Sequence, residues 1–211
     1  MSHDSLTGAT AHPDGLATAK AALRAAMLAR RAELSAAAAR SGAESPGEAL
    51  ARHLLAALPP PPGATVAGFW PIRDEIDTRP LLHALARRGH AILLPVTPPR
   101  GQPLSFRQWR PGAVLERGRF GTLHPVDASP APPPEWLLVP LLAFDAQGGR
   151  LGYGAGYYDR TLALLPGAVA VGLAYAGQQV PEVPVGPGDK RLAAVATEKG
   201  VIRCAPPAHP P

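Results

Sequence analysis

The residues best suited to chemistry cluster at 148–160, which read GGRLGYGAGYYDR. Glycine stands at every second position from 152 to 156, just before a predicted helix. Glycine lets backbone N–H groups converge on an anion, and a helix N-terminus adds positive partial charge. Asp159 can hold Mg²⁺, and Arg150 can neutralise a second phosphate. The segment matches neither the Walker A spacing nor the dinucleotide fingerprint. The pattern predicts either a phosphate-binding loop or a plain strand-to-helix turn with a buried tyrosine pair.

Lys20 and Arg24 form a second candidate. Their spacing of four residues places both cations on one face of a predicted helix, where they repel each other unless an anion lies between them. The alternative is a solvated basic face, which is a common feature of helices. The chain contains only two further lysines, Lys190 and Lys199, so a lysine at this position favours a functional role.

Carboxylates in two loops are further candidates. The segment 73–78 follows a predicted strand and precedes a predicted helix. Asp77 is explained as a helix N-cap, whereas Glu75 is free to contact a ligand. Asp189 is either a second metal carboxylate or a turn residue. Trp70 is either a stacking platform for a planar ring or part of the core.

The elements that must position these residues alternate between helix and strand. Hydrophobic periodicity predicts helices over 16–40, 44–58, a segment beginning at 77–78, and 157–165. It also predicts buried strands over 65–70, 91–95, 136–140, 169–174 and 193–197. The segment 193–197 is expected to be the last core strand. Residues 97–134 are expected to be irregular, with a possible edge strand over 104–109. This order predicts an α/β three-layer sandwich with a mostly parallel central sheet and helices on both faces. Ligands of such sheets bind at the carboxyl ends of the strands.

Composition limits the remaining possibilities. The 211 residues are 46% hydrophobic and 18% charged, which suits a single α/β domain over 16–204 between a loose tail (1–15) and a Pro-rich tail (205–211). Cys204 is the only cysteine, so an internal disulfide is excluded. No secretory signal or membrane span is recognised, so we expect a cytoplasmic monomer without membrane contact.

The net charge is +5, which favours anionic partners. The arginines are scattered, and no basic run is interleaved with aromatic residues. A nucleic-acid groove requires such a pattern, so we expect no nucleic-acid partner and favour a small anionic substrate.

Several of these motifs occur in an order that resembles the 5-formyltetrahydrofolate cyclo-ligase family, also called 5,10-methenyltetrahydrofolate synthetase. The glycine-Tyr-Tyr-Asp segment is the most specific of them. The matching segments are Lys20-x-x-x-Arg24, 74–78, 139–145, 150–160, 171–175 and 195–198. The sequence departs from the family pattern at Gly188, where histidine is usual, at Ala193, where an acid is usual, and at His124, where glutamate is frequent.

The resemblance implies an ATP- and Mg²⁺-dependent ring closure of 5-formyltetrahydrofolate, with or without a polyglutamate tail, to 5,10-methenyltetrahydrofolate, ADP and phosphate. It implies that Arg150, Tyr158 and Asp159 are catalytic and that Asp159 and Asp189 hold the metal. The implied ATP contacts are Lys20, Arg24, Arg150, Leu151, Gly152, Tyr153, Gly154, Ala155, Gly156, Tyr157 and Tyr158. The implied folate contacts are Arg24, Trp70, Glu75, Tyr153, Gly154, Ala155, Gly156 and Tyr157.

Two other interpretations stay open at this point. The chain could keep the fold without catalysis and bind folate, nucleotide or RNA. It could also be an ATP-dependent kinase of another small acid. The three functions differ in their products, because only the cyclo-ligase forms the methenyl compound.

Overall fold

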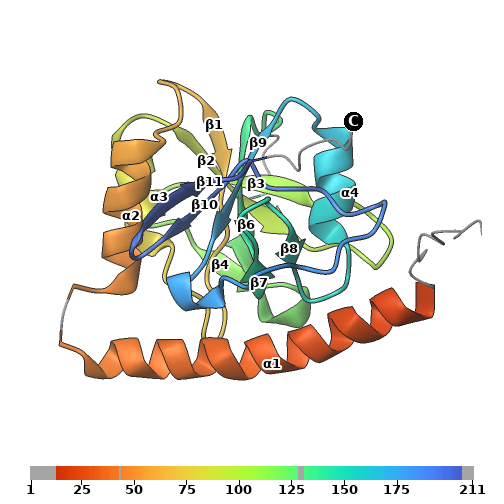
Figure 1. The fold of residues 1–211 in the computed structure, drawn as a ribbon. Coiled ribbons are helices and arrows are strands. Elements are labelled where there is room, and N and C mark those ends of the chain that lie inside the picture. The colour runs from red at the N-terminus through yellow and green to blue at the C-terminus, as the bar shows by residue number, and fades with distance from the viewer. Residues whose placement is uncertain (1–12, 43, 128–130, 206–211) are drawn as a thin grey trace, which may run out of the picture.

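The computed structural model describes residues 13–42, 44–127 and 131–205 (Figure 1). The helices are α1 (Pro13–Arg40), α2 (Pro46–Ala57), α3 (Arg79–Arg87) and α4 (Tyr157–Leu164), with short 3-10 turns η1 (Arg119–Gly121) and η2 (Ala176–Gln178). The strands are β1 (Thr65–Ala67), β2 (Ala91–Val96), β3 (Ser105–Trp109), β4 (Leu115–Arg117), β5 (Leu123–Pro125), β6 (Trp136–Pro140), β7 (Ala143–Phe144), β8 (Arg150–Leu151), β9 (Val169–Leu173), β10 (Ala194–Thr197) and β11 (Gly200–Arg203).

A seven-stranded sheet with the order β11-β10-β9-β6-β1-β2-β3 forms the centre of the molecule. The inner strands β10, β9, β6, β1 and β2 pair in parallel. The edge strands β11 and β3 run antiparallel to their neighbours. Parallel pairing brings the carboxyl ends of the inner strands to one edge of the sheet, which is where loops can form a ligand site.

Helices cover both faces of this sheet, with α2 and α3 on one side and α4 on the other (Figure 1). Ile92 and Leu94 of β2 belong to the same core cluster as Leu50 of α2, whereas Leu93 belongs to the cluster that includes Leu162 of α4. Successive strand side chains point to opposite faces, so a continuous apolar strand is buried on both sides. The predicted three-layer α/β sandwich is confirmed.

Helix α1 is long and crosses the sheet at one end rather than covering a face (Figure 1). Met27, in the middle of α1, is buried against Leu142 and Val183, which lie in loops, and against Leu151 of the short strand β8. The helix therefore rests on the loops that follow the strands. Its side chains can reach the site where parallel strands end.

Several predicted boundaries differ from the structure. Helix α1 begins at Pro13, so residues 13–15 of the expected tail are helical, while residues 1–12 and 206–211 lie outside the described residues. The strand predicted over 65–70 pairs only over β1. The segment 193–197, predicted as the last core strand, forms the buried strand β10, and an unpredicted edge strand, β11, follows it as a hairpin. Residues 97–134, expected to be irregular, contain the edge strand β3 and also the unexpected β4–β5 hairpin.

Candidate functional site

A cavity of about 650 Å³ opens at the carboxyl ends of the parallel strands. This volume lies in the range of small-molecule sites, roughly 300–1,000 Å³. Its walls come from the loops after β1 and β2, from the end of β6, from the glycine-rich segment and from α1. The residues predicted for the site all line it: Lys20, Arg24, Trp70, Glu75, Arg150, Leu151, Gly152, Tyr153, Gly154, Ala155, Gly156, Tyr157, Tyr158, Asp159 and Asp189.

The glycine-rich segment forms one wall of this cavity. Gly154 (φ +96°) and Gly156 (φ +69°) adopt left-handed backbone conformations, which side chains strongly disfavour. Space is also limited, because a Cβ added at Gly154 would lie 3.3 Å from the guanidinium carbon of Arg24. Within the described part of the chain, the amides of residues 152–156 donate no hydrogen bond to a protein acceptor. These unused donors, next to the N-terminus of α4, suit an anion.

Two cations of α1 face this segment. The Nε of Arg24 donates a hydrogen bond to the Gly152 carbonyl at 3.0 Å. Lys20 lies one helical turn earlier, and its Nζ donates to Oδ2 of Asp189. The two cations share one helix face, as their spacing predicts, and both line the cavity. The structure thus brings residues near 20, 152 and 189 together.

A second ion pair lies beside the first. The Nη2 of Arg150 donates to Oδ1 of Asp159 at 2.6 Å, and the Lys190 amide donates to the same oxygen at 3.0 Å. The Arg150 side chain is only 5% exposed, and its Nε has no hydrogen-bond partner among the residues that the structure describes. Buried charges in proteins are normally paired and fully hydrogen-bonded, so this arrangement can accept a further anionic ligand.

The environment of Asp189 keeps it ionised. Partial burial alone would raise the pKa of Asp189, but hydrogen bonds from the Lys20 ammonium and the Gly186 amide hold it below its usual range. Asp189, predicted as either a turn residue or a metal carboxylate, is thus paired with Lys20 of α1. At the neighbouring position Gly188, an added Cβ would meet no atom within 4 Å, so the backbone there does not require glycine for lack of space.

Two adjacent tyrosines at the start of α4, Tyr157 and Tyr158, line the cavity. The Tyr157 hydroxyl donates to the Pro98 carbonyl at 2.9 Å, and the Arg160 guanidinium lies 5.3 Å from the Tyr157 ring centre. Burial, reinforced by the Glu75 charge, raises the pKa of Tyr158. Tyr158 therefore stays neutral and can serve only as a hydroxyl, not as a phenolate.

Comparison with known proteins agrees with this arrangement. Residues 17–198 match the model of the 5-formyltetrahydrofolate cyclo-ligase family. This chain belongs to that family. The 5-formyltetrahydrofolate cyclo-ligase of Escherichia coli strain K12 is 35% identical over 162 residues, covering 74% of this chain and 89% of the relative. The cyclo-ligase of Mycolicibacterium smegmatis is 33% identical over 157 residues, covering 66% of this chain and 77% of the relative.

The fold agrees with the same family. The NMR structure of Aquifex aeolicus 5,10-methenyltetrahydrofolate synthetase superimposes with a TM-score of 0.70 at 30% identity, covering 87% of this chain and 92% of that one. Among the described residues, no helix has both the length and the apolar character that a bilayer crossing requires.

The segment after β1 contributes Glu75 and Trp70 to the cavity wall. Glu75 is 6% exposed, and burial raises its pKa, although Oε2 accepts the Ile72 amide at 3.0 Å. Trp70 packs against the buried Trp109 with ring centres 5.8 Å apart while still lining the cavity. Asp77, predicted as a helix N-cap, accepts a hydrogen bond from the Arg79 amide at 3.0 Å at the start of α3. Glu75 is therefore the carboxylate of this loop that faces the cavity.

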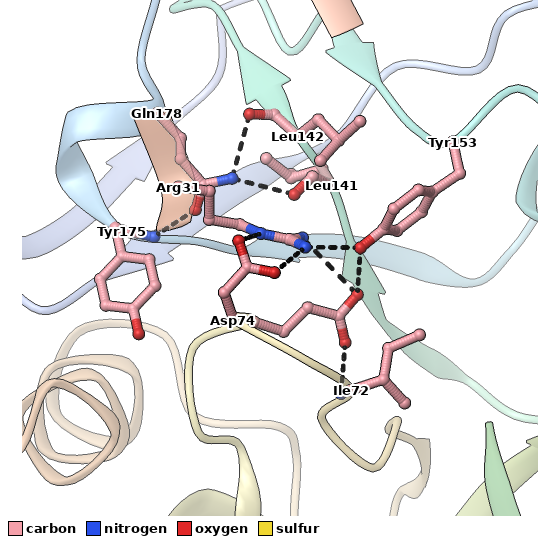
Figure 2. Close-up of polar contacts among 9 residues, drawn as sticks. Arg31, Ile72, Asp74, Leu141, Leu142, Tyr153, Tyr175 and Gln178 are labelled. Atoms are coloured by element: carbon pink, nitrogen blue, oxygen red, sulfur yellow. Dashed lines mark hydrogen bonds and ion pairs between the residues drawn. The ribbon is translucent and has the colours of Figure 1, made fainter. Parts of the chain in front are cut away.

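Arg31 is the residue that the sequence interpretation missed. It lies on α1, and its guanidinium donates to both Asp74 oxygens at 3.2 and 2.9 Å and to the Tyr153 hydroxyl at 2.6 Å (Figure 2). Its Nη1 lies 3.7 Å from Glu75 Oε1. The signal was available in the sequence, because Arg31 stands seven residues after Arg24 and such a spacing returns to the same helix face.

Proposed function

We infer that this chain catalyses the ATP-dependent cyclisation of 5-formyltetrahydrofolate to 5,10-methenyltetrahydrofolate. Family membership supports the reaction. The single structural observation that carries it is the run of unused amides at 152–156 in a cavity wall, with Lys20 and Arg24 beside them. Phosphoryl transfer depends mainly on positioning and on charge stabilisation, and this wall offers both.

In the first step, the formyl oxygen of the substrate attacks the γ-phosphorus of ATP, and ADP leaves. We assign the stabilisation of the developing phosphoryl charge to the amides of 152–156, to Lys20 and to Arg150. These groups are held in place before the reaction, because Arg24 binds the Gly152 carbonyl and Asp159 binds Arg150. Preorganised donors cost no reorganisation as the charge develops.

In the second step, the N10 lone pair attacks the activated formyl carbon. The new C–N bond forms, N10 loses its proton, the C–O bond breaks and phosphate leaves with the oxygen. No side-chain nucleophile is required. Cys204 does not line the cavity, and burial raises its pKa to about 11, so its thiol is not suited to such a role.

On the folate side, we assign Glu75 to an N–H edge of the pterin and Trp70 to its flat face. Both line the cavity, and the Ile72 amide fixes one oxygen of the Glu75 carboxylate. Tyr153, from the glycine-rich segment, lines the same cavity, and its hydroxyl donates to Glu75 Oε1 at 3.4 Å. A carboxylate that accepts hydrogen bonds from a heterocycle orients the ring as well as binding it.

Mg²⁺ is part of the proposal, with Asp159 and Asp189 as its protein ligands. Within the described ranges, no group of three or more His, Cys, Asp or Glu side chains gathers into a metal cage. The donor set still fits Mg²⁺, which is usually held by one or two carboxylates together with substrate phosphates. Asp159 Oδ2 and Asp189 Oδ1 have no hydrogen-bond partner among the described residues. When bound, the ion would neutralise phosphate charge.

The test uses the purified full chain with ATP, Mg²⁺ and 5-formyltetrahydrofolate. We expect an absorbance band of the methenyl product in the near ultraviolet, with equal amounts of ADP and phosphate, and none without ATP. ADP release without the band would instead indicate a kinase of another acid. Tight binding of folate or RNA without ADP release would indicate a binding protein. The cytoplasmic location, the monomeric state and the polyglutamate tail of the substrate stay predictions from the sequence.

A further inference from the structure

Arg31 occupies a position that neither packing nor solubility explains. It is 1% exposed and lies near the middle of α1, a helix whose outer face is in water. It does not line the cavity, although Glu75 and Tyr153, which it contacts, both do. Burying an arginine is costly unless its partners compensate the lost hydration. The molecule therefore retains a buried charge directly behind one wall of the site.

The partners of Arg31 come from separate loops. Asp74 and Glu75 belong to the loop after β1, and Tyr153 belongs to the glycine-rich segment. The Arg31 guanidinium donates two hydrogen bonds to Asp74 and one to the Tyr153 hydroxyl (Figure 2). The Tyr153 hydroxyl in turn donates to Glu75 Oε1 at 3.4 Å. One side chain of α1 thus joins the wall assigned to folate to the wall assigned to ATP.

We propose that Arg31 is a positioning residue for the folate half of the site. It fixes the positions of the Glu75 and Tyr153 side chains relative to each other and keeps the Glu75 carboxylate charged for the substrate. The proposal rests on the proposed function. Arg31 would act through these two residues and would not touch the substrate. The planar guanidinium suits this role, because its donors have a rigid geometry that a lysine ammonium lacks.

The charges around Glu75 explain why a cation is needed there. The groups that face Glu75 are Arg31 from α1, Asp74 from its own loop, Tyr153 from the glycine-rich segment and Tyr158 from α4. Burial raises the pKa of Glu75, and the Asp74 charge adds to this effect. Arg31 is the cation of this group, and it opposes both effects. Without it, a smaller fraction of Glu75 would be ionised at neutral pH.

The test compares Arg31→Gln with Arg30→Gln. Arg30 lies next to Arg31, but its side chain is 51% exposed and, within the described ranges, its ion pair is with Glu33 on the same helix, so its replacement removes the same charge without touching the site. For Arg31→Gln we expect the KM for 5-formyltetrahydrofolate to rise by about tenfold to a hundredfold, as expected for a misplaced binding group, with the KM for ATP changed much less. Arg30→Gln should behave like the parent chain.

The pH profile separates positioning from general damage. Between pH 6 and 9, the acid limb of kcat/KM for the folate should move to higher pH in Arg31→Gln, because the Glu75 pKa rises further when the cation is lost. In Arg31→Lys the charge remains, so the limb should stay near its original pH while the KM for folate still rises. A merely structural role would lower activity without moving the limb.

The outcomes are distinct. Equal changes in the two KM values, or an unmoved acid limb in a folded Arg31→Gln protein, would overturn the inference. If Arg31→Gln does not fold, the KM values of Arg31→Lys decide alone: a selective rise for folate supports positioning, and unchanged or equally changed values reject it. If the parent chain forms no methenyl product, the proposed function itself fails before any variant is compared.

Discussion

Replacing Asp159 by asparagine separates the charge of this side chain from its shape. Asp159 Oδ1 accepts the Arg150 guanidinium at 2.6 Å and the Lys190 amide at 3.0 Å. An asparagine Oδ1 can accept both hydrogen bonds, so the loop keeps its contacts. Alanine would remove the acceptor altogether and leave the nearly buried Arg150 unpaired, at a cost of about 3–5 kcal/mol. Asp159→Asn is therefore the more informative variant.

The expected loss of stability is small. A hydrogen bond to a charged group contributes about 1.5–3 kcal/mol and a neutral one about 0.5–1.5 kcal/mol, so Asp159→Asn should lower the free energy of unfolding by about 1–2 kcal/mol. For a chain of this size, that corresponds to a fall in Tm of about 2–8 °C. The variant should therefore be fully folded at 25 °C.

The expected loss of activity is much larger. If Asp159 helps to hold Mg²⁺ and anchors Arg150 at the phosphoryl group, its charge acts where negative charge develops. Removing one such preorganised group typically lowers kcat about 10²–10³-fold. The assay follows the near-ultraviolet band of the methenyl product at a series of Mg²⁺ concentrations. We expect the half-saturating Mg²⁺ concentration to rise as kcat falls.

One result would refute this reasoning. A folded Asp159→Asn protein with the kcat and the Mg²⁺ dependence of the parent chain would show that the Asp159 charge serves neither metal nor phosphoryl group. The Arg150–Asp159 pair would then be an ion pair that only stabilises the fold.

Two further predictions concern the charged neighbours of the site. Lys20→Gln should raise the KM for ATP by about tenfold, which corresponds to the loss of one charge-assisted hydrogen bond, with little change in the KM for folate. Lys199 is exposed and lies outside the cavity, so Lys199→Gln is the matched control. An equal KM for ATP in both variants would show that Lys20 does not bind the phosphates. Asp74→Asn should cost about 2–3 kcal/mol at pH 7, because it removes one of the two hydrogen bonds from the buried Arg31 and weakens the other. Burial alone would raise the pKa of Asp74, but Arg31 holds it below its usual range. The stability difference should therefore be complete above the unfolded pKa of about 3.9 and vanish as the pH falls through the lower folded pKa. Urea unfolding at pH 7 and pH 3 checks this, and a difference of the same size at both pH values would contradict it.

The sequence predicted the sheet and its covering helices well where burial on both faces produced continuous apolar strands. The stretch 91–95 shows this, because Ile92, Leu93 and Leu94 are all buried. Prediction failed where strands are short and partly exposed. β11 lies at the sheet edge with no fully buried residue, and β4 has two exposed residues of three. Such strands form because a neighbouring strand supplies their backbone hydrogen bonds, and the local residue pattern hardly indicates that neighbour.

The chemistry of the individual groups in the site could be predicted from local sequence alone. Alternating glycines before a helix can adopt the conformations that Gly154 and Gly156 show, and this capacity is local. The spacing of Lys20 and Arg24 places them on one helix face in any fold, because helical periodicity is also local. Which of these groups contact one another depends on long-range packing. Lys20 pairs with Asp189, 169 residues away, and Arg31 reaches Asp74 and Tyr153, because α1 crosses the ends of the strands. The direction of such a helix depends on how its apolar side chains pack on distant loops, and no local pattern encodes that direction.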